Sequence, residues 1–126
     1  MSSTSFKVRL SAADAHYAGQ LVSGARVLEF FGDAATELLI RNDGDEGLFR
    51  AYEKVEFLAP VRSGDFLEIR AEITKVGNTS RQMKFGAYKI IEARPTPDNP
   101  HSAVTLDKPV LAVSAIGTCV VKKSSH

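Results

Sequence analysis

Hydrophobic and polar positions change their spacing along the chain, and each change predicts a different element. Residues 6–10 alternate between apolar and polar side chains and predict a short strand, whereas residues 11–22 follow no clear period and predict a loop. From Ser23, a residue type that caps helices, the spacing becomes helical, and the helix should run roughly from Val22 to Arg41. The apolar stripe of this helix consists of Val27, Phe31, Ala34, Ala35 and Leu38.

Four longer runs after the helix predict strands. They cover residues 48–57, 66–76, 79–92 and 110–121. The dipeptide Gly77-Asn78 predicts a tight hairpin between the second and third of these strands. Residues 93–109 contain Pro95, Pro97, Pro100 and Pro109, and they predict a long loop.

The order of these elements predicts a single α+β domain over residues 1–126. A helix with so wide an apolar stripe can be wrapped by a strongly curved antiparallel sheet, which makes it the central helix of the fold. Some expected strands carry apolar residues on both faces, so we expect a homodimer or a dimer-based higher oligomer.

Composition and charge argue against several classes of function. The chain has 16 basic and 15 acidic residues, and a net charge of +1 argues against a nucleic-acid partner. No apolar run is long enough to cross a bilayer and the first residues lack a signal peptide, so we expect a cytoplasmic protein without a membrane partner. Cys119, the one cysteine, lies in an apolar run and should be a buried thiol. No metal or cofactor is expected, because His16, His101 and His126 lie far apart and no nucleotide-binding loop is present.

Two stretches of the chain resemble the hotdog superfamily, whose members mostly act on acyl-CoA thioesters. Residues 16–24 (HYAGQLVSG) resemble the family's loop in which a small residue and a glycine open the central helix. Residues 57–65 (FLAPVRSGD) and 76–80 (VGNTS) resemble the family's Pro-Val turn and its hairpin. The resemblance covers most of residues 14–92 and implies a hotdog fold, an antiparallel sheet wrapped around one central helix.

A closer resemblance is to the 3-aminobutyryl-CoA ammonia-lyases of lysine fermentation. It is carried by residues 13–19 (ADAHYAG), 24–29 (GARVLE) and 43–47 (DGDEG). This resemblance implies a carbon–nitrogen lyase that eliminates ammonia from L-3-aminobutyryl-CoA to give crotonyl-CoA, reversibly and without a cofactor.

Hotdog enzymes use the N-terminus of the central helix as an electrophile, because free backbone N–H groups and the helix dipole point at the thioester carbonyl. Here the substrate-binding donors would be Ser23 or Gly24. Elimination also needs a base for the α proton and a group that handles the leaving amine. The candidate catalytic residues are Asp14, His16 and Glu29. Glu29 would take the α proton while Asp14 or His16 handles the amine, or the reverse.

Each candidate catalytic residue also has a structural explanation. Asp14 could cap a turn, His16 could be an ordinary loop histidine, and Glu29 could pair with Arg26. The Asp14-x-His16 pair resembles the Asp-then-His pair of hotdog hydratases, although its spacing is shorter.

Two other functions remain compatible with the sequence. A hotdog thioesterase commonly carries an acidic residue two turns into the helix, where this chain has Phe31, and a shift of two residues would be needed to use Glu29 or Asp33. A non-catalytic acyl-CoA-binding module is the third possibility. In each case residues 93–109 could cover an acyl pocket, and basic side chains could bind the phosphates of CoA. The candidates for the phosphates are Arg62, Lys75, Arg81 and Lys84.

Overall fold

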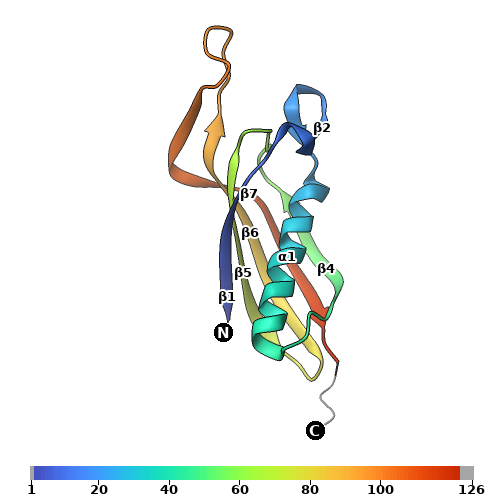
Figure 1. The fold of residues 1–126 in the computed structure, drawn as a ribbon. Coiled ribbons are helices and arrows are strands. Elements are labelled where there is room, and N and C mark those ends of the chain that lie inside the picture. Colours follow the sequence, from blue (N-terminus) through green and yellow to red (C-terminus); the bar gives the residue numbers. More distant parts are fainter. Residues whose placement is uncertain (1, 123–126) are drawn as a thin grey trace.

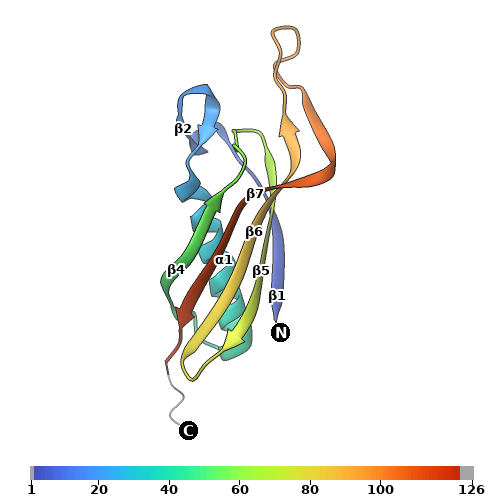
Figure 2. The same cartoon turned by 180° about the vertical axis from the view of Figure 1, so that it is seen from behind.

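A curved five-stranded sheet wraps around one helix in the computed structural model, which describes residues 2–122 (Figures 1 and 2). The strands are β1 (Ser3–Arg9), β4 (Leu48–Phe57), β5 (Phe66–Val76), β6 (Ser80–Ala93) and β7 (Ala103–Val120). Their order across the sheet is β1–β5–β6–β7–β4, and every neighbouring pair is antiparallel. The helix α1 (Gly24–Asp43) covers one face of the sheet. The predicted α+β class and the predicted central helix are therefore confirmed.

The hydrophobic core lies between α1 and the sheet. The helix buries its predicted stripe together with Phe30 and Leu39. Alternate residues of β5 and β6 point at the helix, and the ring of Phe31 stacks on that of Phe85 with centroids 5.2 Å apart. Burial of this apolar surface, at roughly 25 cal/mol per Å², fixes the helix against the sheet and so fixes the position of its N-terminus.

Both ends of α1 are capped. Ser23 is confirmed as the N-cap, since its Oγ accepts a hydrogen bond from the backbone N–H of Ala25 at 3.1 Å. The helix ends two residues after the predicted Arg41, at Asp43. The cause is Gly44, which adopts a left-handed φ of 70° and donates its N–H to the carbonyl oxygen of Ile40 at 2.9 Å.

A buried ion pair closes the C-terminal end of the helix. The Arg81 guanidinium donates to both carboxylate oxygens of Asp43 at 2.7 and 3.0 Å, and also to the backbone carbonyls of Gly77 and Ser80. Only 7% of Arg81 is exposed. This side chain therefore joins the helix to the β5–β6 hairpin and is not free to bind a phosphate.

The prediction of a loop over residues 93–109 is wrong at both ends, because β6 continues to Ala93 and β7 begins at Ala103. Only residues 94–102 form the turn between β6 and β7. The strand tolerates Pro109 because the register shifts there, and residues 106–109 bulge out opposite a single residue of β6. The resulting hairpin projects beyond the rest of the sheet at the end where α1 begins (Figure 1).

The predicted loop over residues 11–22 contains short regular segments. They are 3₁₀ turns at Ala12–Asp14 and Ala18–Gln20 and the strands β2 (Ala15–Tyr17) and β3 (Leu21–Val22). The two short strands pair with each other in an antiparallel hairpin. Gly19 and Gln20 turn the chain between them with φ values of 71° and 63°, so that β3 leads directly into α1.

Candidate active site

The first turn of α1 leaves one backbone donor free. The N–H of Ala25 is taken by the Ser23 side chain, and the N–H of Arg26 by the Ser23 carbonyl oxygen at 3.1 Å. The N–H of Gly24 has no acceptor among residues 2–122. A free N–H at the positive end of a helix dipole stabilises negative charge that develops on a nearby oxygen. Gly24 therefore offers the donor that the sequence analysis predicted for this turn, whereas the Ser23 hydroxyl serves as the cap.

A phenyl ring occupies the space that a side chain at Gly24 would need. A Cβ atom built on Gly24 would lie 2.2 Å from Cε1 of Phe57. Phe57 is the last residue of β4, and 59% of it is exposed. Glycine at this position is therefore required by close packing against β4, in addition to the access that it gives to the backbone.

A cavity of about 570 Å³ opens at this turn, and it is called the thioester cavity below. Its walls are the start of α1, the β2–β3 hairpin and residues 57–61. The lining is mainly apolar, and its side-chain hydroxyl groups belong to Tyr17 and Ser23. Cavities of this size accept small ligands, and apolar walls with few polar groups are typical of such sites. No charged side chain lies among the lining residues, all of which are in the described part of the chain.

Arg26 joins two of the predicted catalytic residues. Its Nε lies 2.8 Å from Oδ1 of Asp14, and its Nη1 lies 3.3 Å from Oε2 of Glu29. The guanidinium also lies over the ring of Phe30, 4.4 Å from the centroid. The second oxygen of Asp14 accepts hydrogen bonds from the backbone N–H and the hydroxyl of Ser11 at 2.7 and 3.2 Å. The structural explanations for both carboxylates are thus present, since Asp14 caps a turn and Glu29 pairs with Arg26.

The two carboxylates differ in their freedom to react. The hydrogen bond from the Ser11 backbone, together with the Arg26 guanidinium, holds the pKa of the Asp14 carboxyl below its ordinary value. The Asp14 side chain is only 15% exposed, and both of its oxygens are occupied. The Glu29 side chain is 67% exposed, and its contact with Arg26 is longer. Glu29 is therefore the carboxylate that is more accessible to a ligand.

Glu29 lines a groove that meets the thioester cavity at Ala25. The groove has a volume of about 400 Å³ and lies between α1 and β4. Ala25 lines both the groove and the cavity, so the two hollows adjoin along the first turn of the helix. Tyr52, also in the groove, donates its hydroxyl to the carbonyl oxygen of Leu28 at 3.3 Å, and burial raises its pKa to about 12. Tyr52 is therefore a structural group, and Glu29 is the one carboxylate among the residues that line the groove.

His16 lies apart from the Arg26 network. It is exposed in β2, and its ring meets the Tyr17 ring edge-on with centroids 4.7 Å apart. Tyr17, which lines the thioester cavity, was not predicted from the sequence, and Arg26 was predicted only as a partner of Glu29. The signal for Tyr17 is the alternation of side chains along β2, but a strand of three residues is too short to be recognised from periodicity.

Two buried positions carry no catalytic group. Phe31, the position at which a thioesterase often has its carboxylate, has no exposed surface and packs on Phe85. Cys119 is buried as predicted, and burial raises the pKa of its thiol to about 11. A thiol with so high a pKa is not a nucleophile at neutral pH.

A buried ion pair holds the turn between β4 and β5. Asp65, 1% exposed, accepts hydrogen bonds from the backbone N–H groups of Arg62 and Ala93, both at 2.8 Å. The Lys89 ammonium lies 3.3 Å from Asp65 and donates to the carbonyl oxygen of Pro60 at 2.7 Å. These contacts explain the aspartate of the motif FLAPVRSGD, and together they fix one wall of the thioester cavity.

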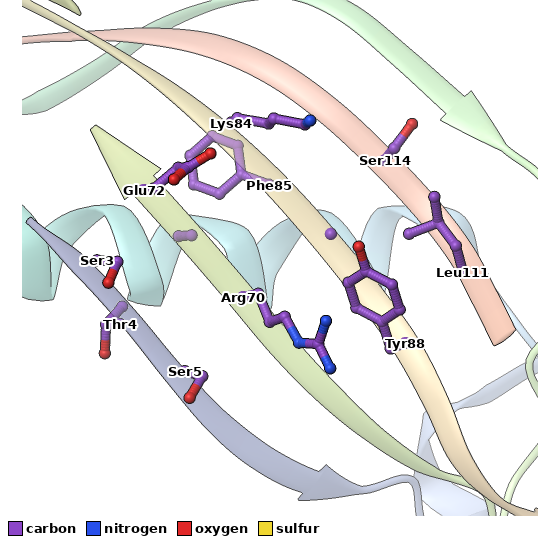
Figure 3. Close-up of a pocket in the computed structure, with 12 residues that line it drawn as sticks. Ser3, Thr4, Ser5, Arg70, Glu72, Lys84, Phe85, Tyr88, Leu111 and Ser114 are labelled. Carbon is purple, nitrogen blue, oxygen red and sulfur yellow. The ribbon is translucent and has the colours of Figure 1, made fainter. Parts of the chain in front are cut away.

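A hollow of similar size lies on the sheet face turned away from α1 (Figure 3). Its volume is about 610 Å³. Arg70 stacks there on the ring of Tyr88 at 4.0 Å from the centroid and pairs with Glu68. The residues predicted to carry the chemistry do not line this hollow, so it is not the candidate active site.

The described residues contain no group of three or more His, Cys, Asp or Glu side chains that could hold a metal ion. His126, considered above, lies outside these residues. Within residues 2–122, no helix is both long and apolar enough to cross a membrane.

Comparisons with known proteins agree with the fold. The thioesterase superfamily matches residues 19–91. The 3-aminobutyryl-CoA ammonia lyase of Acetoanaerobium sticklandii is 57% identical over 120 residues, which cover 95% of this chain and 94% of that protein. The structure of the β-alanyl-CoA:ammonia lyase from Clostridium propionicum has a TM-score of 0.92 and 41% identity, with 97% of this chain and 86% of that chain covered.

A more distant structure shows the fold alone. A hexameric hotdog fold thioesterase of Campylobacter jejuni has a TM-score of 0.69 and 20% identity, with 91% of this chain and 79% of that chain covered. The predicted hotdog fold and the predicted family resemblance are therefore both confirmed. The chain belongs to the thioesterase superfamily and, within it, to the family of the 3-aminobutyryl-CoA ammonia lyases.

Proposed function

We propose that this protein is a carbon–nitrogen lyase that reversibly eliminates ammonia from L-3-aminobutyryl-CoA to give crotonyl-CoA. The observation that carries the proposal is the free N–H of Gly24, which opens into an apolar cavity that adjoins the groove of Glu29. The choice of substrate is supported by the 57% identity to the lyase of A. sticklandii over nearly the whole chain.

In this proposal the thioester carbonyl accepts a hydrogen bond from Gly24. Removal of the α proton places negative charge on that oxygen, so the donor and the helix dipole stabilise the enolate more than the substrate. The apolar walls of the thioester cavity exclude water, which strengthens the interaction. Ser23 contributes by capping the helix and holding its first turn in place.

Glu29 is the proposed base. Its carboxylate takes the α proton, the electron pair of the C–H bond becomes the new C=C bond through the enolate, and the electron pair of the C–N bond leaves with nitrogen. Because the amine enters as an ammonium group, it departs as neutral ammonia and needs no separate acid. The protonated Glu29 then returns its proton to solvent or to ammonia.

Asp14 and His16 are proposed to handle the amine. Asp14, Arg26 and Glu29 together carry a net charge of −1, which favours a substrate ammonium group near the start of α1. Asp14 keeps this charge because its pKa is held low. His16 is exposed and free to exchange protons with ammonia as it leaves.

Incubation of the protein with L-3-aminobutyryl-CoA tests the proposal. We expect ammonia and the absorbance of an enoyl thioester to appear in equal amounts, and crotonyl-CoA with ammonium to give the reverse reaction. Release of a free thiol from several acyl-CoAs would instead identify a thioesterase. Binding of acyl-CoA without either product would identify a binding module.

We also propose that the chain forms a homodimer or a dimer-based oligomer through β4. This strand lies at the edge of the sheet, and an exposed edge readily pairs with a second copy. Large apolar side chains are exposed along it or just after it: Leu48 at 73%, Phe57 at 59% and Leu58 at 54%. Light scattering should give a multiple of 13.7 kDa, and a mass of 13.7 kDa would contradict the proposal.

A further inference from the structure

A second cavity, of about 520 Å³, lies at the end of the molecule where α1 begins. Four segments form its walls: the end of β1 with residues 11–12, the turn at residues 19–20, the turn at residues 62–64, and the projecting β6–β7 hairpin. None of the catalytic residues proposed above lines it. Its position beside the start of the helix makes it a candidate for holding a second part of the substrate.

The ionisable side chains that line this cavity are all basic residue types. They are Arg9, Arg62 and His101, and the lining hydroxyl groups belong to Ser11, Ser63 and Ser102. The lining includes no Asp or Glu side chain. Guanidinium groups with nearby hydroxyls are the groups that proteins use to bind phosphate.

The two arginines of the cavity have no carboxylate partner among residues 2–122. Five of the eight arginines in the chain form ion pairs, and the other three are Arg9, Arg50 and Arg62. Two of these three therefore lie in one cavity. An arginine without an acidic partner keeps its hydrogen-bond donors free for a ligand.

Two acidic groups next to the cavity are already neutralised. Asp14, which accepts hydrogen bonds from Ser11, is paired with an arginine at 2.8 Å. Asp65, which follows the turn at residues 62–64, is buried and paired with a lysine at 3.3 Å. These two carboxylates therefore do not cancel the positive charge of the cavity, and Asp98, in the same hairpin as His101, does not line it.

This cavity and the thioester cavity lie on the two sides of one backbone bridge. Leu21 pairs with Arg62; Leu21 and Val61 line the thioester cavity, whereas Gln20 and Arg62 line the basic one. A ligand that begins at Gly24 and crosses this bridge enters the basic cavity.

We propose that the basic cavity binds the phosphate groups of the CoA thioester, with Arg9 and Arg62 as the principal ligands and His101 supplied by the β6–β7 hairpin. The inference rests on the CoA-thioester substrate named under Proposed function. Of the four residues predicted from the sequence to bind the phosphates, only Arg62 lines this cavity, and Arg9 is added from the structure.

Calorimetric titration with CoA and with pantetheine, which lacks the phosphates, tests this assignment. For the variant Arg9→Gln/Arg62→Gln we expect the affinity for CoA to fall about tenfold for each arginine, as is usual when a charged hydrogen bond is lost, while the affinity for pantetheine stays unchanged. Arg62→Lys keeps the charge but loses the planar guanidinium group, so its affinity for CoA should lie between that of wild type and that of the double glutamine variant. The matched control is Arg41→Gln, at the other end of α1, which should bind CoA as wild type does.

Wild-type affinity of the double variant for CoA would overturn the assignment, and so would a parallel loss of pantetheine binding. The titration needs no turnover, so it separates this inference from the proposed reaction. If the titrations give the expected affinities but no ammonia is released, the proposed function alone is overturned. Ammonia release with unchanged CoA binding in the double variant would overturn the phosphate site alone.

Discussion

The two ends of α1 differ in whether their polar groups have hydrogen-bond partners. At the C-terminal end, the N–H of Gly44 caps the helix, and the Arg81 guanidinium donates hydrogen bonds to both carboxylate oxygens of Asp43. At the N-terminal end the N–H of Gly24 is left without an acceptor among the described residues and faces an open cavity. The first N–H groups of a helix have no partner within the helix, so this donor remains available to a ligand in the cavity.

This difference indicates that the C-terminal end of α1 contributes mainly to stability, whereas the N-terminal end contributes mainly to activity. Substitutions at the closed end should change the free energy of unfolding and leave the chemistry intact. Substitutions at the open end should change turnover and leave the fold nearly unchanged. The predictions below test this division.

The largest effect is expected from Glu29→Gln at the open end. Loss of the proposed base should lower kcat for ammonia release by about 10³-fold, within the usual range for general bases. The melting temperature should hardly change, because the side chain is 67% exposed. The control Glu46→Gln, an exposed carboxylate just beyond the closed end, should keep wild-type kcat. Wild-type turnover in Glu29→Gln would remove this residue from the mechanism.

At the closed end, Arg81→Gln should destabilise the fold by about 3 kcal/mol, because it leaves the partly buried Asp43 without its partner. Urea unfolding measures the loss. Turnover per folded molecule should match wild type, since the pair lies at the far end of the helix from Gly24. A large loss of kcat in the folded variant would show that the two ends are not independent. Arg41→Gln, which removes only an exposed pair, provides the control for stability.

Gly24→Ala should lower kcat/KM by about tenfold, because the new methyl group displaces the Phe57 ring and shifts the wall of the thioester cavity. The double variant Gly24→Ala/Phe57→Ala removes the clash and should recover most of the activity. Steady-state kinetics of the two variants measure this. No recovery in the double variant would mean that the glycine is needed for access of the thioester itself.

Asp14→Asn removes a group proposed to handle the amine, and it should also lower stability, although by less than Arg81→Gln does. The folded protein holds the pKa of Asp14 below that of the unfolded chain, so the carboxylate stabilises the fold above its unfolded pKa and this contribution disappears as the pH falls through the folded value. At neutral pH we expect a loss of about 1 kcal/mol, and the difference from wild type should shrink below about pH 4. Urea titrations at several pH values measure it. A difference that grows toward acid pH would contradict the sign of the shift.

Much of the fold could be predicted from the sequence, because the period of a long amphipathic helix and of long strands is a strong signal. Ser23 could be recognised as the cap of α1, and the motif FLAPVRSGD could be recognised as a turn. The extension of β7 to Ala103 could not, because prolines normally interrupt strands and only the bulge at residues 106–109 allows Pro109 to remain.

The candidate site was predicted only in part. Asp14 and Glu29 were named, but the sequence does not show that Arg26 contacts both, since one of these contacts joins residues twelve positions apart in different elements. The basic cavity could not be predicted from the sequence either, because Arg9, Arg62 and His101 come from three distant segments that only the tertiary fold brings together.

The most direct test of the central role of Gly24 compares two variants, one of which lacks the N–H at position 24 while the other keeps it. Proline lacks this N–H and is favoured at the first position of a helix, and Ser23 already has the extended backbone that proline requires before it. Gly24→Pro/Phe57→Ala and Gly24→Ala/Phe57→Ala therefore differ mainly in the one donor. We expect the proline variant to have about 10²-fold lower kcat for ammonia release, with equal affinity for CoA and equal stability. Equal kcat in the two variants would show that the helix N-terminus does not stabilise the enolate.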